Sequence, residues 1–385
     1  MNSTSAGADQ IERLKASVAG HVATLFTRPS SLKFGERGRE WSWRWGYWGR
    51  ALSKLYCATG DPDLLALFDQ THQGFRAYRD DSLRLRDDLR GRVMKTWGTR
   101  LRGQNDKGHR ACEVETTGLL LLPYTDLLLR AGDELPENLR AGLIETVRQG
   151  LDAHAREFLE HPPSDGGYFV SEWTGGVEPL NHTHLYAAVA AEAFGITGEE
   201  RYLKIAQQAY AFFRHNWFEE ENRTVSWAYA PTPDSSNMMH APQVFGQPGF
   251  DHAVGGELFF KAGVTIELPL AMYRIGLIDR TDLELIAASL RQNVLVGRTT
   301  VNMYISPRKI LPDRLQKRQT QMIKPEYISM YYRLAPFDPF MEGRLDTLID
   351  ARTDWFPDGL KDGSAALFAA AFRAFEPRGR FYHTW

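Results

Sequence analysis

Cysteine is scarce in this chain. Cys57 and Cys112 are the two cysteines present, too few for a disulfide framework or for a zinc site with four thiolate ligands. Both stand in apolar surroundings with helical spacing. We therefore expect both to be core residues.

Long apolar runs and an excess of charge of one sign are missing as well. No run reaches the roughly 18 residues that a membrane-spanning helix needs, and the first ten residues lack the basic and apolar regions of a secretory signal. With 46 basic and 48 acidic residues the net charge is −2, so no overall positive field would attract nucleic acid. The sequence predicts a soluble protein with no membrane or nucleic-acid partner. It is expected in the cytoplasm as written, and in the periplasm or outside the cell if a signal has been removed.

The composition is that of an ordinary globular protein. The chain has 385 residues, of which 43% are hydrophobic and 24% charged, so it can bury a large core. No linker or break in composition divides it, and we expect a single domain over residues 1–385. Several of the ten tryptophans stand among Gly, Asn and Arg, where stacked rings beside polar groups suit sugars.

Helical periodicity dominates the chain, and strand-like alternation is scarce. Apolar residues at three- and four-residue spacing predict helices over 10–27, 41–58, 62–79, 111–131, 137–160, 183–196, 200–217, 254–275, 281–295 and 363–375. The predicted fold class is therefore all-α.

An internal repeat joins these helices in pairs. Ala58-Thr-Gly-Asp61 and Ile196-Thr-Gly-Glu199 each place a glycine after one helix and an acidic residue before the next. Weaker copies at 130–133 and 275–279 give helical hairpins roughly every 65 to 80 residues. Long stretches at 92–110, 164–182, 218–252 and 296–325 alternate with these tight turns, and loops of such length are usually functional. We expect a complete or incomplete ring of helical hairpins, with the long loops over a central cleft.

One set of polar residues carries the strongest indication of function. Asn181 and His182 begin a predicted helix, and Arg223 and Tyr229 follow about forty to fifty residues later. An amide, an imidazole, a guanidinium and a phenol are the groups needed to remove a weakly acidic C–H proton beside a carboxylate and to protonate a leaving oxygen. Without this context, Asn-His before a helix would most simply be an N-cap followed by a surface histidine.

On these residues and the helical hairpins, the chain resembles the (α/α)-toroid polysaccharide lyases, alginate lyases in particular. The resemblance implies an (α/α) toroid whose catalytic residues are Asn181, His182, Arg223 and Tyr229. It covers most of the chain as architecture but is specific only over residues 181–229. Two positions depart from the family pattern: Leu180 stands where a second Asn is usual, and Ala230 where His often follows the Tyr.

The chemistry of such a lyase fits the residue types. Asn181 and Arg223 would neutralise the carboxylate of a uronate and stabilise the charge that develops when the C5 proton leaves. His182 suits a base near neutral pH, and Tyr229 would protonate the leaving O4 or perform both transfers with help from a nearby cation. We expect an acidic polysaccharide or oligosaccharide as partner, and neither a cofactor nor a metal. No motif indicates the oligomeric state.

Further residues are candidates for substrate binding, because arginine and lysine bind carboxylates and tryptophan stacks on sugars. The predicted set is Lys95, Trp97, Arg100, Arg102, Gln104, Glu115, Trp173, His184, Trp227 and His252. A solvated loop is the alternative interpretation of the cationic segment 92–110. His252 follows Asp251, which is expected to cap the helix after the longest loop.

Four other functions remain open at this point. Glu113 and Glu115, completed by Asp251 or Glu257, would suit a toroidal glycoside hydrolase with paired carboxylates. A uronyl C5-epimerase would abstract the same proton and return it to the other face. A metal site would draw on His182, His184, His240, Asp251 and His252, although His-x-His is a weak signal. A carbohydrate-binding protein without catalysis would have no need of the aligned Asn, His, Arg and Tyr.

Overall fold

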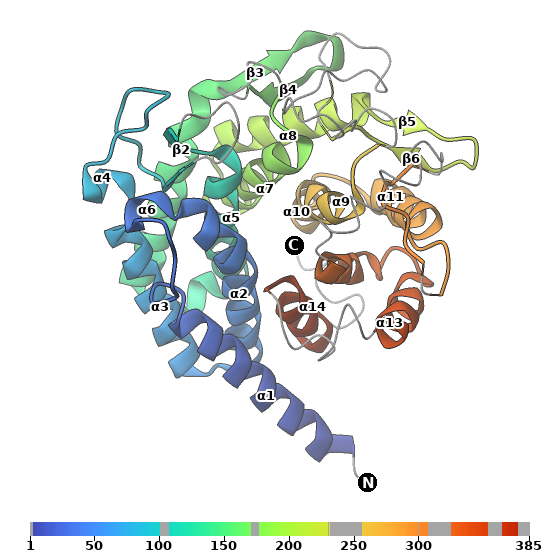
Figure 1. Ribbon diagram of the computed structural model, residues 1–385, viewed down its shortest axis with the longest axis horizontal. Coiled ribbons are helices and arrows are strands. Elements are labelled where there is room, and N and C mark those ends of the chain that lie inside the picture. Colours follow the sequence, from blue (N-terminus) through green and yellow to red (C-terminus); the bar gives the residue numbers. More distant parts are fainter. Residues whose placement is uncertain are drawn as a thin grey trace. The chain divides into compact units, whose positions relative to one another are not determined.

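The chain is mostly helical. The computed structural model describes residues 3–100, 108–170, 177–229, 231, 256–298, 300–306, 325–352 and 364–375 (Figure 1). Within these ranges the named strands form three separate antiparallel pairs. The predicted all-α class is confirmed. None of the described helices combines the length and the apolar character that crossing a bilayer requires.

The chain divides into two compact units. The described part of unit 1 falls within Met1–Arg156, Glu192–Glu199 and Leu360–Pro377, and that of unit 2 within Glu157–Ala191 and Glu200–Gly359. Helix α7 (Leu180–Thr197) contributes residues to both. The single domain expected for residues 1–385 stays a prediction.

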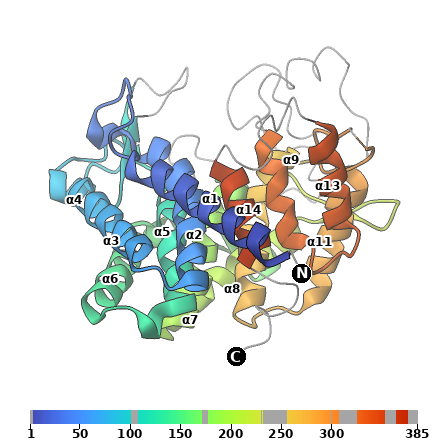
Figure 2. The same cartoon turned by 90° about the horizontal axis from the view of Figure 1, so that it is seen from below.

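Unit 1 is built around one central helix. Its long helices are α1 (Ser3–Ala23), α2 (Gly38–Thr59), α3 (Pro62–Ala77), α5 (Val114–Ala131), α6 (Glu137–His154) and α14 (Ser364–Phe375). Helix α2 packs against α1, α3, α5 and α14, and Figure 2 shows α1 lying across it. Trp41, Trp45 and Trp48 on α2 are buried. These three tryptophans therefore fill the core and are not presented to a sugar.

Two glycines let α2 approach α5 closely. A Cβ atom at Gly46 would lie 3.0 Å from the backbone oxygen of Leu119, and one at Gly49 would lie 2.8 Å from Cβ of Pro123. Glycine inside a helix costs roughly 0.5 to 1 kcal/mol relative to alanine. The close packing of the two helices offsets that cost.

The predicted turns between helices are present. Gly60 ends α2 in the left-handed region at φ 64°, and the Asp61 side chain accepts a hydrogen bond from the Asp63 amide to cap α3. Gly198 and Gly276 also have positive φ values, of 71° and 73°. Gly132 differs, because its φ is −54° and it begins the 3-10 helix Gly132–Glu134 instead of a left-handed turn.

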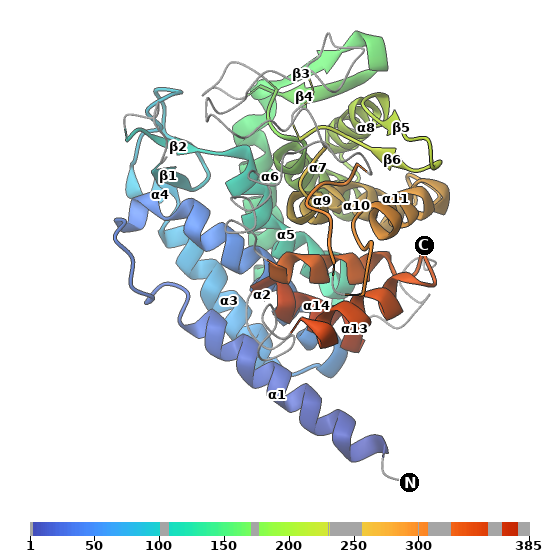
Figure 3. The same cartoon turned by 45° about the vertical axis from the view of Figure 1, so that its right-hand side comes forward.

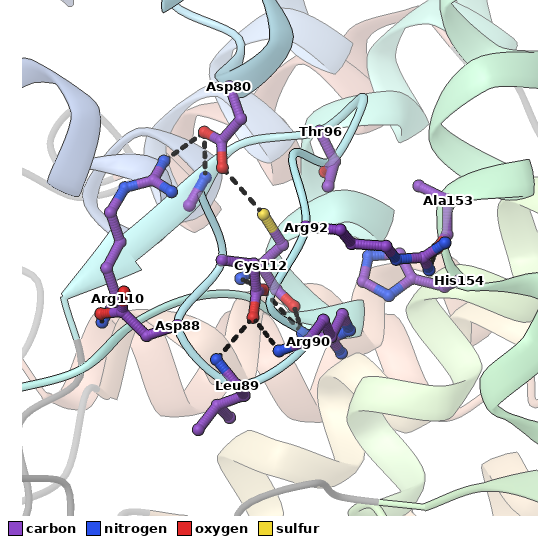
Figure 4. A network of polar contacts seen from close by, with 12 residues as sticks. Asp80, Asp88, Leu89, Arg90, Arg92, Thr96, Arg110, Cys112, Ala153 and His154 are labelled. Atoms are coloured by element: carbon purple, nitrogen blue, oxygen red, sulfur yellow. Dashed lines mark hydrogen bonds and ion pairs between the residues drawn. The ribbon is translucent and has the colours of Figure 1, made fainter. Parts of the chain in front are cut away.

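Unit 1 also holds a short hairpin of β1 (Gly98–Arg100) and β2 (Arg110–Cys112). A group of polar residues holds this hairpin in place, and we term it the anchor network: Asp80, Asp87, Arg90, Arg110 and Cys112. Asp80 begins the short helix α4 (Asp80–Leu83), and the Arg110 guanidinium and the Cys112 thiol both donate to its carboxylate (Figure 4). The Asp87 carboxylate accepts from the Cys112 amide at 2.7 Å. Buried charges thus fix the hairpin to the chain that precedes it.

Unit 2 combines helices with two hairpins. Its elements are β3 (Phe158–His161), β4 (Gly166–Phe169), the start of α7, α8 (Glu200–His215), β5 (Phe218–Glu219), β6 (Val225–Ser226), α9 (Phe259–Thr265), α10 (Glu267–Arg274), α11 (Arg280–Asn293), the 3-10 helix Pro325–Leu334 and α13 (Met341–Ala351). Strand β4 packs on α8, and α10 contacts α8, α9 and α11 (Figure 3). This packing places the beginnings of α7 and α9 in the same unit.

Several predicted boundaries were wrong. The helix expected over 254–275 is two helices, α9 and α10, which meet at Ile266. The helix expected over 137–160 ends at His154 and gives way to β3. Strands β1, β4, β5 and β6 lie in stretches expected to be irregular, whereas β2 and β3 overlap the helices predicted over 111–131 and 137–160. All these strands are too short for alternation to be visible in the sequence. Helix α13 was missed, although its buried Met341, Leu345 and Leu348 recur at helical spacing.

Candidate active site

Three distant segments of unit 2 are joined by backbone hydrogen bonds around His182. The Leu180 amide, at the start of α7, donates to the Tyr229 carbonyl at 2.8 Å. Two residues earlier in that segment, the Trp227 carbonyl accepts from the Glu257 amide at 2.8 Å, and the Ile305 amide donates to the Glu257 carbonyl at 3.0 Å. The predicted catalytic residues His182 and Tyr229 are therefore brought together by the backbone itself.

His182 is nearly buried and has a carboxylate partner. Its side chain is 9% exposed, and Nδ1 lies 2.6 Å from Oε1 of Glu178. The His182 and Tyr229 rings meet edge to face, with centroids 6.4 Å apart and an interplanar angle of 82°. A base and a phenol at this separation can act on one sugar residue.

Tyr229 has a cation beside it. The tyrosine is buried, and Nζ of Lys261 on α9 lies 5.8 Å from the centroid of its ring. A positive charge near a phenol favours the phenolate, which is the help that a tyrosine needs to act as a base. The sequence predicted that a cation must assist Tyr229, and the structure places Lys261 there.

Asn181 lies inside the first turn of α7, one residue after its start at Leu180. Its side chain is fully buried, and neither the amide nitrogen nor the amide oxygen has a hydrogen-bond partner among the described residues. Because Asn181 lies inside the helix and is buried, it is not an N-cap followed by a surface histidine. Leaving a buried polar group unpaired costs roughly 1 to 3 kcal/mol, so the amide calls for an explanation.

Arg223 occupies a different environment from the other three. It is exposed in the turn between β5 and β6, with φ of 61° in the left-handed region. Arg223 lies in the hairpin turn that precedes β6, and Tyr229 lies beyond the end of that strand. Within the described chain, the Arg223 guanidinium makes no ion pair with the preceding glutamates, nor any hydrogen bond.

A buried polar network supports the site from within. The Trp227 indole nitrogen donates to Oε2 of Glu257 at 2.6 Å, and the Thr265 hydroxyl donates to Oε1 at 2.9 Å. Nδ1 of His184 lies 2.5 Å from the Thr265 carbonyl. Burial raises the pKa of Glu257 to about 8, against the opposing effect of these two hydrogen bonds, and burial lowers the pKa of His184 to about 4. The network is therefore largely uncharged near neutral pH.

Two of the predicted substrate contacts belong to this network and not to a binding surface. Trp227 and His184 are fully buried, so neither presents a ring face to a sugar. They were expected to bind substrate, and burial against α9 corrects that expectation. Their place in the structure is to hold Glu257 and the end of α9.

The predicted substrate residues of the segment 92–115 lie in unit 1. Trp97 is a core residue whose indole nitrogen donates to the Phe75 carbonyl at 2.8 Å, so its expected role in sugar stacking was wrong. Lys95 and Arg100 are exposed, and Arg100 lies 3.5 Å from Glu36. Arg102, Gln104, Trp173 and His252 lie outside the described residues.

The carboxylates proposed for a hydrolase share one arginine. Arg39 pairs with Glu113 and lies 3.7 Å from Glu115, which is buried in the first turn of α5. Glu115 was expected to bind substrate, but its carboxylate faces this guanidinium. Glu113 precedes the helix, and its carboxylate also accepts from the Thr116 hydroxyl at 3.2 Å.

Glu178 and Lys261 are the site residues that the sequence did not single out. Glu178 stands four residues before His182, the spacing at which a carboxylate and an imidazole meet on a helical turn. Pro179 between them made this segment look like loop. Lys261 stands four residues after Glu257, with no motif around it.

Over the part of the chain that is described, no three histidine, cysteine or acidic side chains gather as metal ligands, and His240, Asp251 and His252 lie outside it. A comparison with protein families finds no family model that matches the chain, and a comparison with curated proteins finds no match.

Proposed function

We propose that the protein is a polysaccharide lyase that cleaves a uronate-containing chain, of the alginate or glucuronan type, by β-elimination. The observation that carries the proposal is the meeting of His182 and Tyr229, whose ring centroids are 6.4 Å apart. Next to them are a lysine and a buried amide that has no partner among the described residues. Proton transfer between positioned groups contributes about 10² to 10⁴ to the rate of such reactions. The helical hairpins are further proposed to form an (α/α) toroid.

The reaction assigns one task to each group. His182 removes the proton at C5, the C5–H electrons form the C4=C5 double bond, and the C4–O4 bond breaks. Tyr229 gives its proton to O4, which leaves as a hydroxyl. The Asn181 amide donates to the uronate carboxylate, where negative charge builds up as the proton departs, and so stabilises the transition state.

Lys261 takes the part that the resemblance gave to Arg223. Its ammonium group lies near the Tyr229 ring, whereas Arg223 is exposed in the turn of the β5–β6 hairpin. A cation close to the phenol attracts a substrate carboxylate and favours loss of the phenolic proton. We therefore assign the cationic role to Lys261 and leave Arg223 out of the catalytic set.

The test is incubation with a panel of polyuronates while ultraviolet absorbance is followed. Elimination alone creates the conjugated 4,5-unsaturated uronate, so absorbance should rise with at least one substrate. Mass spectrometry separates the alternatives: hydrolysis adds one water to the products, and a C5-epimerase leaves the chain intact while exchanging the C5 proton for deuterium from heavy water. Either result would contradict a lyase.

Active-site variants complete the experiment. His182→Gln should abolish product formation, because the base is lost. Tyr168→Phe on β4 removes a phenol from the same unit without touching His182, and should leave the rate unchanged. Equal activity in the wild type and His182→Gln would remove this site from the reaction.

A further inference from the structure

The segment that leads into α7 is fixed before the helix begins. The Glu178 amide donates to the Phe169 carbonyl at the end of β4 at 2.8 Å, and Val177 forms an antiparallel bridge with Val170. The Pro179 carbonyl then accepts from the His182 amide at 2.9 Å and from the Thr183 amide at 3.0 Å. Glu178 and His182 are thus held on one turn, with both ends of that turn anchored.

The side chains make one short contact. Oε1 of Glu178 and Nδ1 of His182 are 2.6 Å apart, and the two side chains are 12% and 9% exposed. Hydrogen bonds that involve an ionised group are shorter and about twice as strong as neutral ones. Because a carboxylate can only accept, the proton in this contact belongs to Nδ1.

The other described ionisable groups near the imidazole have partners of their own, and Glu257 also interacts electrostatically with His182. Glu257, before α9, is bound by the Trp227 indole and the Thr265 hydroxyl, and Lys261 lies over the Tyr229 ring. Tyr229 meets the imidazole edge to face. Glu178 is hydrogen-bonded to Nδ1 of the ring.

We propose that Glu178 is a positioning residue for His182. Its carboxylate holds the neutral imidazole in the tautomer protonated at Nδ1, which leaves the Nε2 lone pair to accept the C5 proton. It also stabilises the imidazolium that forms when that proton arrives. The expected effect of Glu178 on catalysis rests on the proposed lyase function, whereas the assignment of the His182 tautomer does not.

A merely structural ion pair would behave differently. It would hold the first turn of α7 and contribute to stability, without dictating which ring nitrogen carries the proton. The two roles are therefore separated by the tautomer of His182, which the nitrogen chemical shifts of a labelled imidazole report directly.

The first arm of the test uses ¹⁵N-histidine-labelled full-length protein, with His182→Gln to assign the signal. At a pH where the ring is neutral, we expect wild-type His182 to carry its proton on Nδ1 and Glu178→Ala to shift it toward Nε2. Glu221→Gln, which changes an exposed glutamate in the β5–β6 turn, should leave the signal unchanged. A protonated Nε2 in the wild type, or the same tautomer in Glu178→Ala, would overturn the proposal.

The second arm is kinetic. Glu178→Ala should lower kcat by about 10- to 100-fold, part of the factor that positioned proton transfer supplies, with KM unchanged. Glu178→Gln should recover part of the loss, since its amide oxygen still accepts from Nδ1. A rise in KM with kcat unchanged would reject the positioning role. If no polyuronate is cleaved, the proposed lyase function is rejected. The proposal that Glu178 sets the tautomer of His182 is still tested independently by the nitrogen chemical shifts.

Discussion

The two buried polar clusters of this protein differ in how completely they are paired. The anchor network in unit 1 and the group around His182 in unit 2 are both built where loops meet helices. In the anchor network the charges face one another and the backbone. In the second group, which we term the site cluster (Glu178, Asn181, His182, Tyr229 and Lys261), a buried amide has no partner among the described residues.

The anchor network is saturated. Asp80 accepts from Arg110, from the Gly98 amide at 3.0 Å and from the Cys112 thiol at 3.1 Å. Asp87 accepts from the Leu89 and Arg90 amides and from the Arg90 side chain, each within 2.9 Å. Burial raises the pKa of Asp80, although its bonds to Arg110 oppose that shift. Each oxygen of these two carboxylates therefore accepts at least one hydrogen bond from within the protein.

The site cluster keeps unused capacity. The Asn181 amide nitrogen and oxygen lack a partner within the described residues, as do the Thr183 hydroxyl and Nε2 of His184, which lie outside the cluster on the same helix. Saturated buried networks rigidify a fold, whereas unpaired buried polar groups in a native protein tend to mark functional sites. Burial alone therefore does not identify a site. The site cluster is set apart because an amide that is unpaired among the described residues stands next to an imidazole in contact with a phenol.

The largest expected effect is on turnover. Tyr229→Phe should lower kcat by roughly 10² to 10⁴ while substrate binding persists, because the proton donor is lost and the ring remains. Initial rates and calorimetric binding would measure both quantities, with Tyr168→Phe as control. A near wild-type rate would remove Tyr229 from the mechanism. The site cluster would then no longer differ from the anchor network by a catalytic role of this residue.

The next effect concerns stability in the anchor network. Asp80→Ala leaves the Arg110 guanidinium buried without its partner, and removing one member of a buried ion pair costs about 3 to 5 kcal/mol. Urea unfolding followed by tryptophan fluorescence should show the loss, and Asp133→Ala at an exposed position should not. The kcat of the folded protein should stay unchanged. A loss of kcat without a loss of stability would contradict the purely structural role.

The third prediction is a pH dependence of stability. The folded-state pKa of Glu257 is raised by burial from 4.5 to about 8. Between these pH values Glu257 has lost its proton in the unfolded chain but keeps it in the folded protein. The free energy of unfolding therefore falls as pH rises from about 4.5 to 8, and above pH 8 Glu257 no longer changes it. Glu257→Gln should remove that fall. Unfolding free energies of both proteins across this range would test it, and parallel curves would reject it.

A fourth prediction separates stability from activity. Asn181→Leu replaces an unpaired buried amide by an apolar group and should leave the unfolding free energy equal or raise it by up to roughly 1 to 3 kcal/mol, while activity is lost. Asn293→Leu is the matched control. Asn293 is also buried, but its amide donates to Thr224 at 2.9 Å and accepts from Asn222 at 3.0 Å, so this change should destabilise. Thermal unfolding and initial rates measure the two properties. Strong destabilisation by Asn181→Leu would show that the amide is structural.

The smallest expected effect is at Arg223. Glycine tolerates the left-handed backbone of this exposed position, so Arg223→Gly should change stability by no more than roughly 1 kcal/mol. Its rate should stay close to that of the wild type, whereas Lys261→Met should lose activity. The comparison of the two variants on the same polyuronate decides which cation serves the site. A large loss in Arg223→Gly alone would restore the role that the resemblance implies.

The sequence was sufficient for features that depend on neighbouring residues. Periodicity located α2, α3, α8 and α11 to within a few residues, because one face of each helix is buried and repeats along the chain. The glycine turn at 58–61 could be read from its residue types. Asn181, His182 and Tyr229 could be singled out because their chemistry is unusual in that order.

Which polar residues meet depends on the packing of segments that are far apart in the chain. Glu178 precedes a proline, Lys261 stands in no motif, and Trp97 looks like a surface aromatic until it is buried against Phe75. Hydrogen bonds such as that from Leu180 to Tyr229 join residues far apart in the chain, and no local pattern specifies them. The helices and the candidate groups could thus be predicted from local residue patterns. Packing between segments decided their partners, since burial and hydrogen bonding depend on distances in space.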